Sequence, residues 1–292
     1  MINIGIICPS EIAFRRFMPA LSECKDKFNF VGIAVASPEE WGGNSIPDNS
    51  ILANEKQKAQ KFLDSYGGKL FESYKQLIES PEVDAVYLPL PPALHYRWGR
   101  EVLLNGKHLF MEKPFTTSYE DSKKLIELAS EKKLAVHENY MFVYHSQIEY
   151  IKNLIANNEF GTIRLIRIDF GFPFRGANDF RYNKALGGGA LIDCGGYTVR
   201  LASELLGENV ELKTSNLVYS NEYGVDISGS ATLSNEDGLT VQVSFGMDNT
   251  YRCSLDIWGS QKSLFTNRSL TAPIDYEPEM TIISKDGQET IK

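Results

Sequence analysis

Short apolar segments alternate with segments of helical periodicity over residues 1–139, and this alternation restricts the possible folds more than any other feature of the sequence. Residues 3–7 and 30–36 are apolar segments of strand length, and residues 12–21 between them place apolar side chains at helical spacing. A strand, a helix and a second strand in succession form a parallel unit with a right-handed crossover. The sequence therefore begins with a β-α-β unit, which is typical of dinucleotide-binding folds.

The same alternation continues up to residue 139. Strands are predicted within residues 83–88, 107–114 and 134–137, and helices at residues 55–66, 93–105 and 119–132. The buried side of the last helix is expected to carry Leu125, Ile126, Leu128 and Ala129. Residues 37–50 are rich in proline and glycine and predict a loop. We expect residues 1–139 to form an α/β Rossmann domain with a doubly wound parallel sheet.

The pattern changes after Asn139. A helix is predicted at residues 148–155, a strand at 162–170, and a glycine-rich turn at 187–189 that leads into another helix. Polar and apolar residues then alternate over 211–219, 228–233 and 240–245, with turn residues at 235–238. Such alternation indicates an antiparallel sheet with one covered face. Residues 140–292 are therefore expected to form an α+β domain with an open, mainly antiparallel sheet.

The composition excludes several classes of partner. The formal net charge is −8, so the chain lacks the positive charge that binds nucleic acids or anionic membrane surfaces. The first five residues carry no basic charge and begin no apolar run long enough for a signal or a spanning helix, so a cytoplasmic protein is expected. The cysteines and histidines are scattered without ligand spacing, which predicts neither a disulfide framework nor a metal site. They are Cys8, Cys24, Cys194, Cys253, His95, His108, His137 and His145.

A carboxylate, an amine and a proline follow one another at the end of the strand within residues 107–114. They are Glu112, Lys113 and Pro114. Proline biases the residue before it away from the helical region, so Lys113 is expected to stay extended at the strand terminus. In a parallel sheet the carboxyl ends of the strands face the ligand crevice, where chemistry is expected. The local pattern alone favours a solvated lysine in a turn over a functional one.

Two separated groups of residues carry a resemblance to a known family. The first comprises Val83-Asp84-Ala85-Val86-Tyr87, Pro91, His95, Gly106-Lys107-His108 and Glu112-Lys113-Pro114, and the second comprises Gly187-Gly188-Gly189-Ala190-Leu191-Ile192-Asp193, Gly195 and Tyr197. Together they resemble the Gfo/Idh/MocA oxidoreductases, which include glucose-fructose oxidoreductase and inositol dehydrogenase. The similarity runs from about Ile4 to Gly207. It implies a Rossmann domain followed by an α+β domain with an open sheet, and NAD or NADP as cofactor. The second domain, residues 140–292, would bind substrate and mediate oligomerisation.

The resemblance assigns the catalytic residues. It places Lys113 beside the nicotinamide and the substrate oxygen, where an ammonium would stabilise a developing alkoxide or lower the proton affinity of a phenol. Asp193, Tyr197 and Arg200 would project from one helical face, which is expected to meet Lys113. The structural alternatives are a helix N-terminal carboxylate for Asp193, a packed aromatic for Tyr197 and a surface position for Arg200.

Many family members have histidine where this chain has Tyr197. The tyrosine resembles the subgroup with glucose-fructose oxidoreductase, dimeric dihydrodiol and xylose dehydrogenases, and nucleotide-sugar 3-ketoreductases. A phenol with a pKa of about 10 is protonated at neutral pH and suited to give a proton to a carbonyl. This favours reduction.

The phosphate-binding loop departs from the Rossmann fingerprint. Cys8, Ser10 and Ala13 stand where Gly-x-Gly-x-x-Gly/Ala is expected, and Pro9 removes a backbone donor. Neither an acidic residue nor the arginine common in NADP sites is present at Ser37-Pro38, so the choice between NAD and NADP stays open. Arg15 and Arg16 are weak candidates for a phosphate contact. The expected cofactor contacts are Cys8, Pro9, Ser10, Glu11, Ile12, Ser37, Leu90, Pro91, His95, Glu112, Lys113 and Arg181.

The sequence predicts an NAD(P)-dependent oxidoreductase that transfers hydride to or from a sugar or keto-sugar, either free or nucleotide-linked. A homo-oligomer, dimer or tetramer, is expected to form through the C-terminal sheet. Family chains usually continue past this sheet, whereas the printed sequence ends at Lys292. One alternative is a non-catalytic nucleotide- or sugar-binding protein with a degenerate phosphate loop. Another is NAD-dependent glycoside hydrolysis, which Tyr197 makes less favourable.

Overall fold

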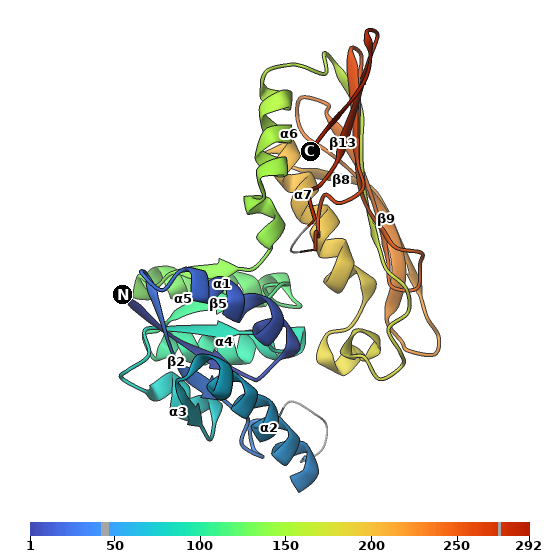
Figure 1. Cartoon of the computed structure of the whole chain (residues 1–292). Coiled ribbons are helices and arrows are strands. Elements are labelled where there is room, and N and C mark those ends of the chain that lie inside the picture. Colours follow the sequence, from blue (N-terminus) through green and yellow to red (C-terminus); the bar gives the residue numbers. More distant parts are fainter. Residues whose placement is uncertain (42–46, 274–275) are drawn as a thin grey trace. The chain divides into compact units, whose positions relative to one another are not determined.

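The computed structural model describes residues 1–41, 47–273 and 276–292 (Figure 1). The chain divides into two compact units, Met1–Asn139 and Tyr140–Lys292, and each is considered by itself. The predicted loop at residues 37–50 lies partly outside the described residues.

The first unit contains a six-stranded sheet in the order β3-β2-β1-β4-β5-β6, and every described strand pair is parallel. The strands are β1 Ile2–Ile7, β2 Phe28–Ala34, β3 Lys69–Phe71, β4 Ala85–Leu88, β5 His108–Met111 and β6 Val136–Glu138. This order confirms the predicted doubly wound Rossmann sheet. The strand order reverses between β1 and β4, and ligands of such sheets bind beside the carboxyl ends of the strands at this point.

The helices of the first unit connect these strands. They are α1 Met18–Glu23, which continues a π-helical turn at Ala13–Phe17, α2 Asn49–Tyr66, α3 Tyr74–Glu79, α4 His95–Leu104 and α5 Tyr119–Lys132. Helix α2 begins six residues earlier than the sequence predicts, because Asp48 caps it by accepting hydrogen bonds from the backbone N–H groups of Ser50 and Ile51. The prediction for Ile126 was wrong. Its side chain is 54% exposed, whereas Leu125 and Ala129 face the core.

The second unit contains an eight-stranded sheet in the order β14-β13-β12-β11-β7-β10-β9-β8. The strands are β7 Ile163–Gly171, β8 Glu211–Tyr219, β9 Asp226–Ser234, β10 Thr240–Gly246, β11 Arg252–Gly259, β12 Lys262–Thr266, β13 Met280–Ser284 and β14 Gly287–Ile291. Among the described strands of this second sheet, only β7 and β10 pair in parallel. This confirms the predicted mainly antiparallel sheet.

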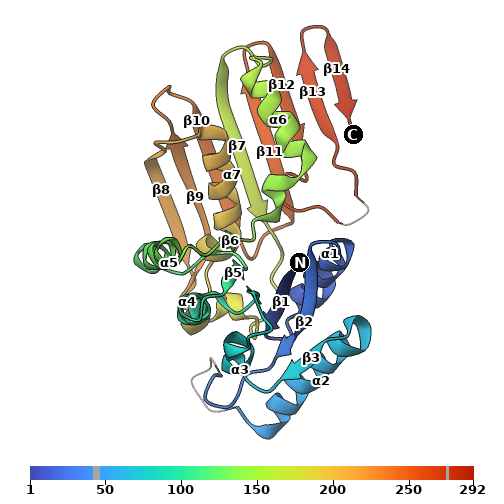
Figure 2. The same cartoon turned by 90° about the vertical axis from the view of Figure 1, so that its left-hand side faces the viewer.

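Helices α6 Ser146–Ala156 and α7 Gly196–Leu206 lie on one face of this sheet (Figures 1 and 2). Alternate strand residues such as Ile166, Val243 and Leu255 form the core beneath them, together with Leu201 of α7. In the described part of the unit, no helix covers the opposite face of the sheet. We call this opposite side the open face.

None of the helices in the described ranges is long and apolar enough to cross a membrane.

Candidate active site

The end of β5 is anchored by Glu112, whose side chain is buried. Its Oε1 atom accepts hydrogen bonds from the Tyr87 hydroxyl (2.6 Å) and from the Asn139 side-chain amide (2.6 Å). Burial and the charge of Glu112 raise the pKa of Tyr87, so the phenol stays protonated and donates. Glu112 therefore ties the end of β5 to β4 and to the residue that follows β6.

The backbone just after Lys113 is held by two further side chains. The Lys113–Pro114 peptide bond is cis. The N–H of Phe115 donates to Glu138 Oε1 (2.6 Å), and the carbonyl of Pro114 lies 2.7 Å from His95 Nδ1. These contacts fix the peptide that presents Lys113, so the lysine leaves the sheet edge from a rigid base.

His95 acts on this segment through the backbone. Its ring is completely buried, and Nε2 lies 2.7 Å from the carbonyl oxygen of Leu90. Burial lowers the pKa of His95, while the carbonyls of Leu90 and Pro114 act in the opposite direction. Both ring nitrogens thus face backbone carbonyl oxygens, and a contact of His95 with the cofactor stays a prediction.

In the loop after β1, Cys8 has a backbone conformation that glycine usually adopts. Cys8 has φ 74°, in the left-handed region that glycine usually occupies. Its N–H donates to Ala34 O (3.0 Å) at the end of β2, and its partly buried thiol forms a hydrogen bond with Tyr74. Loss of solvent around the thiol raises the pKa of Cys8 to about 12. The cysteine side chain therefore packs against the core of the first unit.

The helix that follows this loop begins in a defined way. Ser10 Oγ accepts a hydrogen bond from the N–H of Ala13 (3.2 Å). Glu11 and Ile12 are the first helical residues, and the N–H groups of a first helical turn are available to an anion. The residues present thus fit the pyrophosphate of a dinucleotide.

In the second unit, Arg181 and Asp193 form an ion pair. Arg181 Nε donates to Asp193 Oδ2 at 2.8 Å, and Arg181 Nη1 donates to Asp179 Oδ1 at 3.1 Å. Although burial works against it, these two carboxylates raise the pKa of Arg181 above its usual value. The guanidinium is thus already neutralised, and it fixes the carboxylate of Asp193. A contact of Arg181 with the cofactor stays a prediction.

Tyr197 lies at the start of α7 and packs against the aromatic rings of Tyr140, Phe142 and Phe170. The ring centroids of Tyr140 and Phe170 are each 5.1 Å from that of Tyr197. Packing on several sides holds the phenol in one orientation. Arg200 instead forms an ion pair with Glu204 (2.6 Å) and is exposed, so the structure does not group it with Asp193 as the helical spacing suggested. A π-helical turn at Leu191–Gly195 changes the helical register between these residues.

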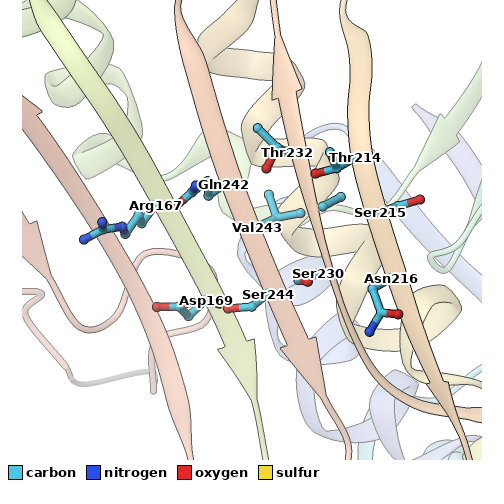
Figure 3. Close-up of a pocket in the computed structure, with 11 residues that line it drawn as sticks. Arg167, Asp169, Thr214, Ser215, Asn216, Ser230, Thr232, Gln242, Val243 and Ser244 are labelled. Atoms are coloured by element: carbon cyan, nitrogen blue, oxygen red, sulfur yellow. Dashed lines mark hydrogen bonds between the residues drawn. The ribbon is translucent and has the colours of Figure 1, made fainter.

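A hollow of about 420 Å³ lies elsewhere, on the open face of the second unit (Figure 3). Polar side chains on β7 to β10 line it, among them Arg167, Asp169, Gln242 and Ser244. None of its lining residues is one of the predicted site residues. The hollow therefore belongs to the surface of the sheet and not to the candidate active site.

A six-stranded parallel sheet of this order, with a loop and a helix after its first strand, is the architecture of a dinucleotide-binding domain, and here an open-sheet unit follows it. The family models agree. Residues 48–140 match the oxidoreductase family with an NAD-binding Rossmann fold, and residues 148–265 match the GFO/IDH/MocA C-terminal domain. The chain belongs to the GFO/IDH/MocA family.

Several relatives are nucleotide-sugar enzymes. The dTDP-3,4-didehydro-2,6-dideoxy-alpha-D-glucose 3-reductase of Streptomyces violaceoruber is 35% identical over 99% of this chain and 79% of its own length. The crystal structure of KijD10, a 3-ketoreductase from Actinomadura kijaniata in complex with NADP and TDP-benzene, has a TM-score of 0.88 and 33% identity, covering 99% of this chain and 83% of that one. KijD10 has also been solved with one tyrosine replaced by phenylalanine, and with one lysine replaced by alanine or glutamate.

Proposed function

We propose that this chain reduces the carbonyl group of a nucleotide-linked keto-sugar. One observation carries the proposal. The lysine and the tyrosine replaced in the solved KijD10 variants are separated by the same number of residues as Lys113 and Tyr197 in this chain. The 3-ketoreductases among the relatives supply the substrate class.

The proposed division of labour follows from the chemistry of the two side chains. When bound, the dinucleotide supplies the hydride. Tyr197, held in its aromatic cluster, donates a proton to the carbonyl oxygen, because a phenol with an ordinary pKa of about 10 is protonated at neutral pH. Lys113 contributes a positive charge that stabilises the oxygen as negative charge develops on it.

Asp193 is proposed as a supporting residue in this reaction. Its carboxylate is oriented by Arg181 and it precedes Tyr197 by about one helical turn. A carboxylate fixed in this way maintains the polarity and geometry of its surroundings without giving up the proton itself. The proposal therefore assigns it a positioning role.

An aromatic and cationic surface in the second unit supports a nucleotide-linked substrate. Phe174 is 43% exposed and stacks on Tyr223, with ring centroids 6.2 Å apart and planes inclined by 27°. The guanidinium of the neighbouring Arg175 lies over Phe172, 4.6 Å from the ring centroid. A flat exposed ring beside a fixed cation suits a base and a phosphate group.

The test is an assay of turnover with dTDP-3,4-didehydro-2,6-dideoxy-alpha-D-glucose as substrate. Turnover is measured as the disappearance of the reduced nicotinamide cofactor. Tyr197→Phe and Lys113→Ala are each expected to lower kcat by at least about 100-fold, the usual effect of removing an acid-base or electrostatic group. Tyr150→Phe on α6 and Lys123→Ala on α5 are matched controls on helix surfaces and keep normal rates. Unchanged rates in either active-site variant would refute the assignment.

The alternative of a non-catalytic binding protein depended on the altered loop at Cys8, Pro9 and Ser10. Since Cys8 keeps the glycine-like conformation and turns its side chain into the core, the loop gives that alternative no support.

We also propose that the enzyme acts in the cytoplasm as a homodimer or tetramer, formed through the open face of the second unit. Trp258 (59% exposed), Phe265 (47%) and Ile283 (49%) lie on three neighbouring strands of this sheet. Their chain neighbours Ile257, Leu264 and Ile282 are buried, so by strand alternation the exposed side chains point to the open face. A second copy of this chain is the proposed partner for this apolar group.

A further inference from the structure

The turn that follows β2 lies beside the phosphate loop. The N–H of Cys8 donates to the carbonyl of Ala34, the last residue of β2, and Ser37 follows three residues later. In dinucleotide-binding folds the residues after the second strand meet the adenosine ribose, and an acidic residue or an arginine there selects NAD or NADP. The side chains of this turn therefore influence whether NAD or NADP is bound.

Glu40 makes the turn rigid. Its carboxylate is 4% exposed and accepts hydrogen bonds from the backbone N–H groups of Ser37 (3.0 Å), Tyr74 (2.8 Å) and Lys75 (3.0 Å). It thereby joins the turn to the first turn of α3, where the helix dipole favours a negative charge. The backbone of Ser37 is thus held in place.

Glu39 presents its carboxylate next to Ser37. The Ser37 hydroxyl donates to Glu39 Oε2 at 2.9 Å. Hydrogen bonds from its own backbone N–H and from Ser37 lower the pKa of Glu39, so this exposed carboxylate is ionised at neutral pH. The sequence pattern at Ser37-Pro38 did not reveal it, because the acidic residue comes two positions later and reaches back to the serine.

Hydrogen bonds, and no charge of a described cation, account for the lowered pKa of Glu39. Lys58 pairs with Glu55 (2.6 Å), and Arg15 pairs with Glu11 (3.7 Å). Residues 42–46 are Gly-Gly-Asn-Ser-Ile and carry no charge. Arg16 is the remaining arginine of the π-helical turn after the phosphate loop.

We propose that Glu39, oriented by Ser37, makes this chain bind NAD(H) in preference to NADP(H). A ribose diol can donate hydrogen bonds to this carboxylate, whereas a 2′-phosphate would bring a second negative charge against it. The chain would then differ from KijD10, which was crystallised with NADP. The inference rests on the proposed dinucleotide-dependent function and adds the choice of dinucleotide.

The experiment is a fluorescence titration of the full chain with NADH and with NADPH, in the absence of any sugar. The Kd for NADH is expected to be at least about tenfold lower, corresponding to about 1.4 kcal/mol. Glu39→Gln should reduce the ratio of the Kd for NADPH to the Kd for NADH several-fold, and Glu39→Arg should reverse the preference. Glu131→Gln on α5 removes the same charge elsewhere and should leave the ratio unchanged. Added salt should reduce the wild-type ratio, because the repulsion is between exposed charges.

Equal or tighter binding of NADPH to the wild-type chain would overturn the inference, as would a ratio unchanged in Glu39→Gln. If Arg16→Gln selectively weakened the binding of NADPH, Arg16 of the π-helical turn would be the residue that binds the 2′-phosphate. Failure of both dinucleotides to bind would remove the proposed function together with this inference. A clear NADH preference without reduction of the keto-sugar would remove the proposed function alone.

Discussion

Cys8 shows how one residue can replace a fingerprint glycine without losing the shape of the loop. A left-handed conformation costs a non-glycine residue roughly 1–2 kcal/mol. At Cys8 this cost is offset by the packing of a small, partly buried thiol against the core of the first unit. A residue other than glycine can therefore adopt the left-handed conformation at this position.

Substitutions at Cys8 test this account. Cys8→Gly is expected to change the free energy of unfolding by less than about 1 kcal/mol, because relief of the strain compensates for the lost burial. Cys8→Val should lower it by about 2–3 kcal/mol, since a β-branched residue is strained at this φ and overfills the site. Urea unfolding measures both, with Cys24→Val at the partly exposed end of α1 as control. Equal stability of the Gly and Val variants would contradict the left-handed conformation.

His95 makes stability depend on pH. Burial lowers its pKa in the folded chain, so the unfolded chain takes up the proton first as the pH falls through about 6.5. The contribution of His95 is fully present above that pH and is lost below it, with a slope of at most about 1.4 kcal/mol per pH unit.

This dependence is measured by urea unfolding between weakly acid and neutral pH. His95→Gln should flatten the slope, whereas His108→Gln on β5 should not. The pKa of His137 is also lowered by burial, so some slope persists in the His95 variant. A slope that is identical in wild type and His95→Gln would contradict the prediction.

At the scale of elements, the triple-glycine turn organises the second half of the site. The N–H groups of Gly188 and Gly189 donate to the carbonyls of Asn183 (3.0 Å) and Arg181 (2.9 Å). A Cβ on Gly188 would lie 2.3 Å from the carbonyl oxygen of Arg181. Close backbone contact, which only glycine permits, is what brings Arg181 to the carboxylate of Asp193.

Gly188→Ala is therefore expected to lower the free energy of unfolding by about 3 kcal/mol, because backbone has to move to admit the methyl group. Gly106→Ala is the matched control. Gly106 ends α4 in a left-handed cap, with φ 72° and nothing within 4 Å of its Cβ position, so it should cost only about 1 kcal/mol of backbone strain. Urea unfolding of the full chain compares them, and equal losses would show that the contact with Arg181 does not restrict the turn.

The elements were largely predictable from the sequence, and the contacts between them were not. Helix α5 and strand β8 have the predicted limits because hydrophobic period and capping are local properties. The conformation of Cys8 and the pairing of Arg181 with Asp193 depend on segments that meet only in the folded unit. Ile126 was misplaced because its position in the helical period borders the buried side, and only packing decides such a residue.

At the scale of the whole molecule, the open face of the second unit carries two kinds of surface. One part is polar, where Asp169 lies beside Ser244 (Figure 3) and accepts a hydrogen bond from it. Asp169 also accepts a hydrogen bond from Ser254 and pairs with Arg252. The other part is apolar: Ser263 on β12 lies opposite both Trp258 on β11 and Ile283 on β13. Contiguous exposed apolar side chains on a sheet mark an interaction surface.

Trp258→Glu should therefore dissociate the proposed oligomer. In a two-fold interface the residue occurs twice, and loss of two buried tryptophans at about 1.5–3 kcal/mol each raises the Kd by roughly 100-fold or more. Light scattering over a range of protein concentrations should show oligomers for the wild-type chain and monomers for the variant. Ile126→Glu, at an equally exposed position on α5, is the control and should leave the mass unchanged. A wild-type chain that stays monomeric at every concentration, or a Trp258→Glu variant of unchanged mass, would rule out this part of the open face as the interface.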